Sequence, residues 1–266
     1  MWMSFKFAIL NIMIFVLFSV FSSIAAATTP TELSVWLNQQ SFGPEPQTIF
    51  SLYPNINSVF FTEITKWTRN QLNRSAQAAL KNFQGDICNE SSLFKALEAS
   101  KVTPNAGPTE QNFVNSIILI ESAYCIPNVT VEKAFTVFMS PEFRMDVMPH
   151  VDRITPTPYG HCVESSGITG ILLPSTYCVT NKIRKSHDAI IVHSSLFSVA
   201  HGSAFQPLYY REEVLVFSTL STGVGLYRAT FTRSDDLGVT SKYILRTTLD
   251  SSQTSIREGY VDWLQR

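Results

Sequence analysis

The heptapeptide Tyr-Arg-Ala-Thr-Phe-Thr-Arg at residues 227–233 decides the fold, because apolar and polar side chains alternate along it. A period of two is typical of a β-strand that buries one face and exposes the other. Tyr227, Ala229 and Phe231 are therefore expected on a covered face, and Arg228 on the side that faces water. The pattern predicts a sheet with one wet face and one face that other elements must cover.

The rest of the segment from residue 189 to residue 250 continues this pattern. Residues 189–199 form a continuous apolar run, which predicts a strand covered on both faces. Residues 213–220 predict the next strand, and a turn with glycine follows it. A short loop ending in glycine joins residues 226–233 to residues 239–249, so these two segments are predicted to form a hairpin.

The first half of the chain is predicted to be mainly helical. Apolar side chains recur every three or four residues from 58 to 83, and Gly85 follows where a helix would end. Shorter helices are predicted at residues 92–100, 130–139 and 141–147. The expected fold class is α+β, with a helical N-terminal part packed on a C-terminal curved antiparallel β-sheet.

Three segments are less clear. Residues 113–125 follow a helix-start pattern but are dense in β-branched side chains, so they fit a helix or a strand. Residues 255–266 begin with capping-box spacing but contain Gly259, and they also fit either state. Residues 159–188 are expected to begin as one strand and continue as a loop stapled by a disulfide.

The N-terminus has the pattern of a secretory signal peptide. Lys6 precedes an apolar run that reaches Phe21, and small residues follow up to Ala27, where cleavage is expected. The run is shorter than the roughly 20 residues that span a bilayer, which disfavours an uncleaved membrane anchor. No later segment suggests a membrane span, so the chain is expected to be exported to the periplasm, the cell envelope or the extracellular space. The predicted parts are a signal peptide (1–27), a helical N-terminal region (28–108) and an α+β antiparallel-sheet domain (109–266).

Export would place four cysteines in an oxidising compartment, where disulfides form. Four cysteines allow three pairings, and sequence alone does not choose among them. The simplest pairing joins neighbours along the chain, Cys88 with Cys125 and Cys162 with Cys178. No Cys-x-x-Cys pair is present, so neither a zinc site nor a redox motif is expected, and no metal or cofactor is predicted.

Composition limits the possible partners. The chain has 266 residues, 45% of them hydrophobic and 15% charged, with a formal net charge of −1. This is enough apolar material for a core, and no basic stripe suggests a nucleic-acid partner. The oligomeric state is left open.

No recognised catalytic motif is present, neither a nucleophile elbow, a phosphate loop, a dinucleotide fingerprint nor a zinc-protease helix. The remaining catalytic candidates are His150, Asp152 and His161, with Asp146 nearby in the sequence. Histidine and carboxylate together can do acid–base work or hold a metal. The alternative is that these side chains lie solvated in loops that follow a helix.

Residues 113–266 carry a loose series of short motifs. They are Ile126-Pro127, then Glu132 to Phe135, then Ser140 to Phe143, then Met148 to Val151. This spacing resembles the opening of START-like domains of the polyketide-cyclase or helix-grip group. The resemblance implies a strand, two short helices, a run of antiparallel strands and a long final helix that closes an apolar cavity. This chain departs from the pattern because it has at most a short final helix, so the lid is expected from elsewhere, such as residues 58–83.

The favoured function is that of an exported, disulfide-containing protein that binds a hydrophobic small molecule or lipid between the sheet and the helices. The expected pocket is lined by Phe135, Tyr227, Phe231, Tyr243 and Leu245. One alternative is an exported hydrolase that uses the His/Asp cluster. Another is a structural or adhesive envelope protein without catalytic activity, whose wet sheet face is a contact surface.

Overall fold

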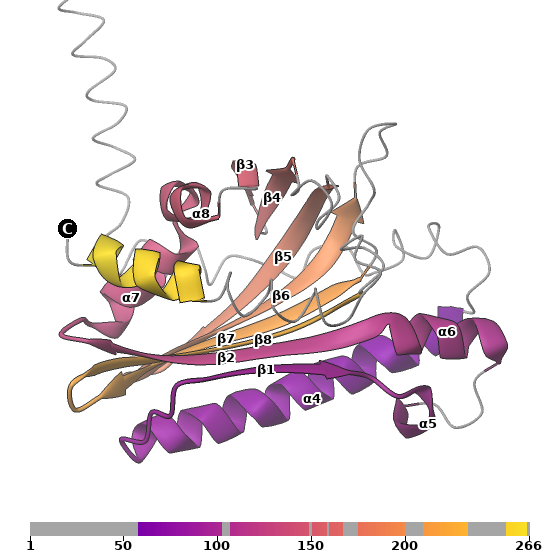
Figure 1. The fold of residues 1–266 in the computed structure, drawn as a ribbon, viewed down its shortest axis with the longest axis horizontal. Coiled ribbons are helices and arrows are strands. Elements are labelled where there is room, and N and C mark those ends of the chain that lie inside the picture. The colour runs from indigo at the N-terminus through magenta and orange to yellow at the C-terminus, as the bar shows by residue number, and fades with distance from the viewer. Residues whose placement is uncertain are drawn as a thin grey trace, which may run out of the picture. The chain divides into compact units, whose positions relative to one another are not determined.

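The alternating segments form one antiparallel sheet. In the computed structural model, residues 58–102, 107–148, 151–158, 160–166, 175–199, 210–233 and 254–264 are described. Within them, eight strands pair in the order β1-β2-β8-β7-β6-β5-β4-β3, and the sheet is curved (Figure 1). The strands are β1 (Ser91–Ala96), β2 (Ile117–Pro127), β3 (Val151–Thr157), β4 (Gly160–Ser165), β5 (Ser175–Lys185), β6 (Ala189–Val199), β7 (Arg211–Leu220) and β8 (Gly223–Arg233).

The helices of the described residues flank this sheet. They are α4 (Ser58–Gln84), α5 (Ala99–Val102), α6 (Pro108–Ser116), α7 (Val131–Met139), α8 (Pro141–Val147) and an unlabelled helix at residues 254–264. The predicted α+β class is confirmed, as are the strands at 189–199, 213–220 and 226–233. The long helix from residue 58 and the helices at 130–139 and 141–147 are also confirmed.

Capping explains why α7 and α8 begin where they do. The hydroxyl oxygen of Thr130 accepts a hydrogen bond from the backbone N–H of Lys133 at 3.3 Å, and that of Ser140 accepts one from the N–H of Phe143 at 3.1 Å. Each bond satisfies one donor that the first turn of a helix leaves free. Ser140 also ends α7, so one residue separates the two helices and fixes the bend between them.

The helix predicted for residues 92–100 is wrong, because residues 91–96 form the edge strand β1. Each residue of β1 pairs with β2, from Ser91 opposite Ala123 to Ala96 opposite Ile118. Tertiary pairing therefore overrides the helical propensity of this short segment. Only Ala99–Val102 is helical.

The two ambiguous segments are resolved. The residues around 113–125 are both helix and strand, since α6 ends at Ser116 and β2 begins at Ile117. Residues 254–264 are a helix, not a closing strand. In the described parts of 159–188, the expected stapled loop is instead strand at Gly160–Ser165 and Ser175–Lys185, because β4 and β5 pair directly. The segment 239–249, predicted as the second hairpin strand, lies outside the described residues.

One face of the sheet, called here the α4 face, is covered by α4. Its members on the central strands are Val214, Val216, Tyr227, Ala229 and Phe231, which share one buried cluster with the apolar side chains of α4. The rings of Phe231 and Trp67 lie 6.0 Å apart. The covered face predicted for residues 227–233 is therefore the α4 face.

Gly225 allows α4 to lie close to β8, because a Cβ atom at this position would overlap the ring of Phe83. We expect Gly225→Ala to lower the free energy of unfolding by about 1–3 kcal/mol, the usual cost of overpacking a core. Urea denaturation measures this loss. Gly85→Ala is the matched control, since the nearest atom to its added Cβ is 3.4 Å away. Equal losses in both variants would contradict the close approach.

The opposite side of the sheet, called here the α7 face, is also covered. Its members on β7 are Arg211, Glu213, Leu215 and Phe217, because side chains alternate along a strand. The ring of Phe217 lies 5.6 Å from that of Phe135 and 5.8 Å from that of Phe138, both on α7.

Helix 254–264 completes this cover through contacts with α7 and α8. The ring of Tyr260 lies 5.5 Å from Phe138 and 5.1 Å from Phe143, and its hydroxyl donates to the carbonyl of Ala134. Lys133 Nζ donates to the carbonyl oxygen of Leu264 at 2.7 Å. The helix expected from the sequence as a lid, α4, lies on the other face, where it covers Tyr227 and Phe231.

The α7 face corrects the prediction of a wet face. Thr230 and Thr232 on β8 are each only 4% exposed. The side chain of Arg228 is 15% exposed and is held in an ion pair. The alternation along 227–233 is thus real, but its polar members are buried in a second interior and not solvated.

The four cysteines form two disulfides, and each cysteine is bonded to its neighbour along the chain, as predicted. Cys88 is bonded to Cys125, and Cys162 on β4 is bonded to Cys178 on β5. The second bond links residues that are direct cross-strand partners.

None of the helices in the described ranges combines the length and apolarity needed to cross a bilayer. The proposed cleavage near residue 27 lies outside the described residues.

Candidate functional site

A row of polar side chains crosses the α7 face. Asn181, Ser194, Glu213 and Thr230 are direct cross-strand partners on the four consecutive strands β5, β6, β7 and β8. Their exposed fractions are 4%, 5%, 5% and 4%. Buried polar groups are costly unless they are paired, so a continuous row of them needs an explanation.

The charged centre of this row is Glu213. Its carboxylate is hydrogen-bonded to Arg211 on the same strand and to Arg228 Nε on β8 at 3.1 Å. Arg211 and Arg228 are 20% and 15% exposed, so the three charges are largely removed from water. The ring of Tyr177 on β5 stacks against Arg211, with 5.6 Å from the guanidinium carbon to the ring centre.

A third guanidinium reaches the cluster from α8. Arg144 Nη1 lies 2.7 Å from Nε2 of His161 on β4. Because arginine can only donate, Nε2 of His161 accepts this bond, and a neutral imidazole then carries its proton on Nδ1. The amide nitrogen of Asn181 lies 3.4 Å from Nδ1; because both atoms then carry hydrogen, this is a contact and not a hydrogen bond. The amide oxygen of Asn181 accepts from Ser194 at 2.7 Å. Arg144 and the polar row thus both contact His161.

The pKa values of this cluster follow from burial and charge. Burial alone would raise the pKa of Glu213, but the charges of Arg228, Arg211 and Arg144 outweigh it and lower that pKa to about 2. Burial lowers the pKa of Arg144 to about 10. Burial, together with the charges of Arg144 and Arg211, lowers the pKa of His161 well below its ordinary value. At neutral pH the carboxylate of Glu213 is ionised and His161 is neutral. Arginine side chains are charged throughout the physiological pH range.

The cluster carries an excess of positive charge. Two guanidinium groups contact the carboxylate of Glu213, and the charge of Arg144 also acts on it. Within the described residues, no second carboxylate contacts Arg144, Arg211 or Arg228. Buried charges without a counterion are strongly unfavourable, which makes this part of the α7 face the candidate functional site.

A buried hydroxyl adjoins the cluster. Thr232 is the direct cross-strand partner of Arg211. Its Oγ1 is buried and has no hydrogen-bond partner among the described residues. A hydroxyl that is left without a partner beside an excess of positive charge can donate to an anion that the arginines attract.

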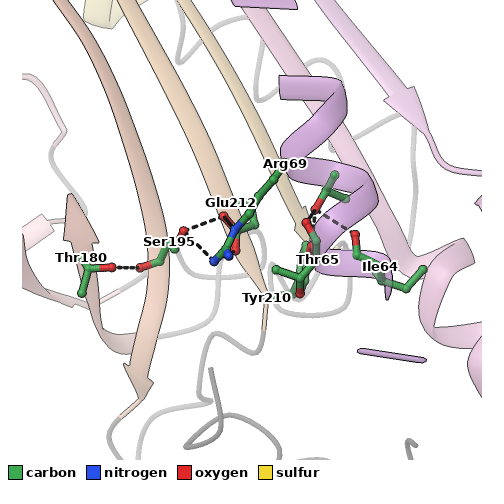
Figure 2. Close-up of polar contacts among 8 residues, drawn as sticks. Ile64, Thr65, Arg69, Thr180, Ser195, Tyr210 and Glu212 are labelled. Carbon is green, nitrogen blue, oxygen red and sulfur yellow. Dashed lines mark hydrogen bonds and ion pairs between the residues drawn. The ribbon is translucent and has the colours of Figure 1, made fainter. Parts of the chain in front are cut away.

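A second polar cluster lies on the α4 face and differs in its charge balance (Figure 2). Arg69 on α4 binds the carboxylate of Glu212 through two donors, at 3.0 and 3.1 Å, and Ser195 donates to the same carboxylate at 2.6 Å. The hydroxyls of Thr68 and Tyr210 lie 2.6 Å apart. One cation here faces one anion, so the cluster is complete without a further charged group. We interpret it as a tether between α4 and the sheet.

The residues predicted to line the pocket are divided between the two faces. Phe135 lies on the α7 face, where it contacts Phe217. Tyr227 and Phe231 lie on the α4 face and pack with the α4 helix. Tyr243 and Leu245 lie outside the described residues.

The predicted catalytic residues are not brought together within the described chain. His161 belongs to the arginine cluster, whereas Asp152 lies near the other end of the β3–β4 pair, where it accepts a hydrogen bond from Ser166 at 3.0 Å. Asp146 accepts one from Trp263 Nε1 at 2.6 Å. His150 lies outside the described residues. In the described part of the chain, no group of three or more His, Cys, Asp or Glu side chains is placed to hold a metal ion.

One feature of the sequence does indicate the arginine cluster, although it was not among the predictions. Glu212 and Glu213 are adjacent and lead directly into the fully apolar run at 214–217. A strand that is apolar on both faces is covered on both faces. Adjacent carboxylates on such a strand must then be buried on opposite sides, and each must have its own cation.

Comparison with known proteins finds similarity in structure only. At the level of sequence, no protein-family model and no curated protein matches the chain. The solved structures that the chain resembles include proteins of the START and lipid-transfer type.

Two of these structures show how far the likeness extends. A STAR-related lipid transfer protein from Xanthomonas axonopodis is 13% identical, with 56% of this chain and 86% of that chain covered and a TM-score of 0.45. Human StAR-related lipid transfer protein 5 is 10% identical, with 74% and 98% covered and a TM-score of 0.45. At these values the function has to be argued from the residues of this chain.

Proposed function

We propose that this chain is an exported binding protein that holds a hydrophobic small molecule or lipid on the α7 face, between the sheet and the helices α7, α8 and 254–264. The observation that carries the proposal is the composition of this face, where a buried charged section adjoins a buried apolar one. Along β7, Arg211 and Glu213 are followed on the same face by Leu215 and Phe217, which are 1% and 0% exposed. Such a surface matches a molecule with a polar end and an apolar body.

The dimensions of this face suggest the size of the ligand. Glu213 and Phe217 are four residues apart on one strand, which corresponds to about 13 Å. Phe217 is in turn covered by Phe135 and Phe138 of α7. A chain of about ten carbon atoms has a similar length, so a medium-chain or longer amphiphile fits the distance between the charged row and the aromatic cover.

The two disulfides support an extracellular or periplasmic location for this activity. Disulfide bonds persist mainly in oxidising compartments, and the structure pairs all four cysteines. They agree with the signal-peptide pattern at the N-terminus. Together they favour a location outside the cytosol for the proposed binding protein.

Native mass spectrometry of the protein purified from its own compartment tests the proposal. We expect a bound species with the mass of an amphiphilic small molecule, which is released when the protein is denatured. Leu215→Phe, which adds volume on the α7 face, should reduce the bound fraction. The neighbouring Val216→Phe adds volume on the α4 face and should leave it unchanged. A protein that carries no ligand and takes up none from a lipid extract would refute the proposal.

A further inference from the structure

We propose that the polar end of the ligand is an oxyanion, a carboxylate or phosphate, held by Arg144, Arg211 and Arg228. This inference rests on the proposed function and specifies the charge of the ligand at the same site. The neutral alternative is an alcohol or a sterol-like molecule, which would need hydrogen-bonding groups but no excess of cations.

The first argument is the charge balance of the cluster. Arg211 and Arg228 share the single carboxylate of Glu213, and Arg144 adds a third positive charge. The described residues therefore leave an excess of two positive charges in a largely buried position. A bound oxyanion would neutralise one or both of them, and its charge-assisted hydrogen bonds would be stronger than those of a neutral group.

The second argument is that Arg144 is fixed in place without a carboxylate. Its Nε donates to the carbonyl oxygen of Phe138 at 3.1 Å, and its Nη2 lies 3.4 Å from the sulfur of Met139, a weak acceptor. Its other contacts are neutral His161 and the ring of Phe138, whose centre lies 5.7 Å from the guanidinium carbon. The guanidinium is thus oriented by neutral groups while its charge is unpaired, an arrangement that is pre-organised for an anion.

The third argument is independent of charge and comes from Thr232. Its hydroxyl is buried beside Arg211 and lacks a hydrogen-bond partner among the described residues. A buried donor without a partner costs free energy, which an oxyanion at this position would recover. The hydroxyl and the guanidinium groups together present donors from β7, β8 and α8 to one region of the α7 face.

Calorimetric titration of the delipidated protein with four probes tests the inference. The probes are dodecanoate, dodecyl phosphate, dodecanol and inorganic phosphate, each below its micellar concentration. We expect at least one of the two amphiphilic anions to bind about tenfold or more tightly than dodecanol, the effect of one charge-assisted hydrogen bond. The stronger of the two anions identifies the headgroup. Inorganic phosphate should bind weakly, because it lacks the apolar body.

Variants locate the effect. Arg228→Gln and Arg144→Gln should each reduce the preference for the anion over dodecanol by about tenfold. Arg69→Gln removes a guanidinium from the tether on the α4 face and should leave this preference unchanged. The comparison of probes on the unmodified protein does not depend on whether the variants fold.

The possible failures are distinguishable. If dodecanol binds as tightly as both anions, the anion inference is refuted while the proposed function stands. If none of the four probes binds, both are refuted. If inorganic phosphate binds as tightly as dodecyl phosphate, the arginines bind an anion but the proposed apolar ligand is refuted.

Discussion

Replacing Glu213 by glutamine is expected to lower the free energy of unfolding at pH 7 by about 3–5 kcal/mol. The carboxylate is the only anion in contact with Arg211 and Arg228 within the described residues. Its loss would leave these two guanidinium groups, and nearby Arg144, as uncompensated buried charges. Urea denaturation at low ionic strength measures the effect. An added amphiphilic anion should restore part of the lost stability, because it binds the folded state alone.

Glu212→Gln provides the matched control, since Glu212 is adjacent in sequence but lies on the other face of the sheet. Its partner Arg69 is 43% exposed and can return to water when the ion pair is lost. We therefore expect a loss of only about 1 kcal/mol. If the two variants lost the same free energy of unfolding, removal of Glu213 would leave no more uncompensated buried charge than removal of Glu212. This would contradict the excess of positive charge around Glu213.

The architecture was largely accessible from the sequence because it depends on local periodicity. The alternation at 227–233, the helical spacing from residue 58 and the cap residues Thr130 and Ser140 each indicate one element without knowledge of its neighbours. Residues 91–96 were misassigned because their strand is defined by pairing with β2, which is a tertiary interaction.

The site was not accessible in the same way. Alternation separates the two faces of a strand, but it does not tell whether the polar face meets water or a second set of helices. In the sequence, Arg228 and Thr230 have the pattern of solvated residues. The face of the sheet on which they lie is buried only because α7 and helix 254–264 pack on it. Asn181, Ser194 and Glu213 come together through strand register, which the sequence does not determine.

Acid should remove the contribution of Glu213 in a defined pH range. Its pKa is lowered from 4.5 to about 2 in the folded protein, since the charges of Arg228, Arg211 and Arg144 outweigh the effect of burial. A carboxyl whose folded pKa is depressed stabilises the fold above its unfolded pKa, and this stabilisation is lost as the pH falls through the folded value. We therefore expect roughly 3 kcal/mol to disappear between about pH 4.5 and pH 2.

Other groups titrate in or near this range, so the test compares the protein with Glu213→Gln. The lowered pKa values of His161 and His193 also reduce stability as the pH falls, starting near pH 6.5. Burial raises the pKa of Glu212, and this acts in the opposite direction. The contributions of His193 and Glu212 are common to both proteins. That of His161 is nearly so, because burial, Arg144 and Arg211 are the larger causes of its lowered pKa and Glu213 the smallest. The gap between their free energies of unfolding should narrow by roughly 3 kcal/mol from pH 5 to pH 2. A gap that stays constant would show that Glu213 is not held ionised by the arginines, and the anion site inferred from their excess charge would lose its basis.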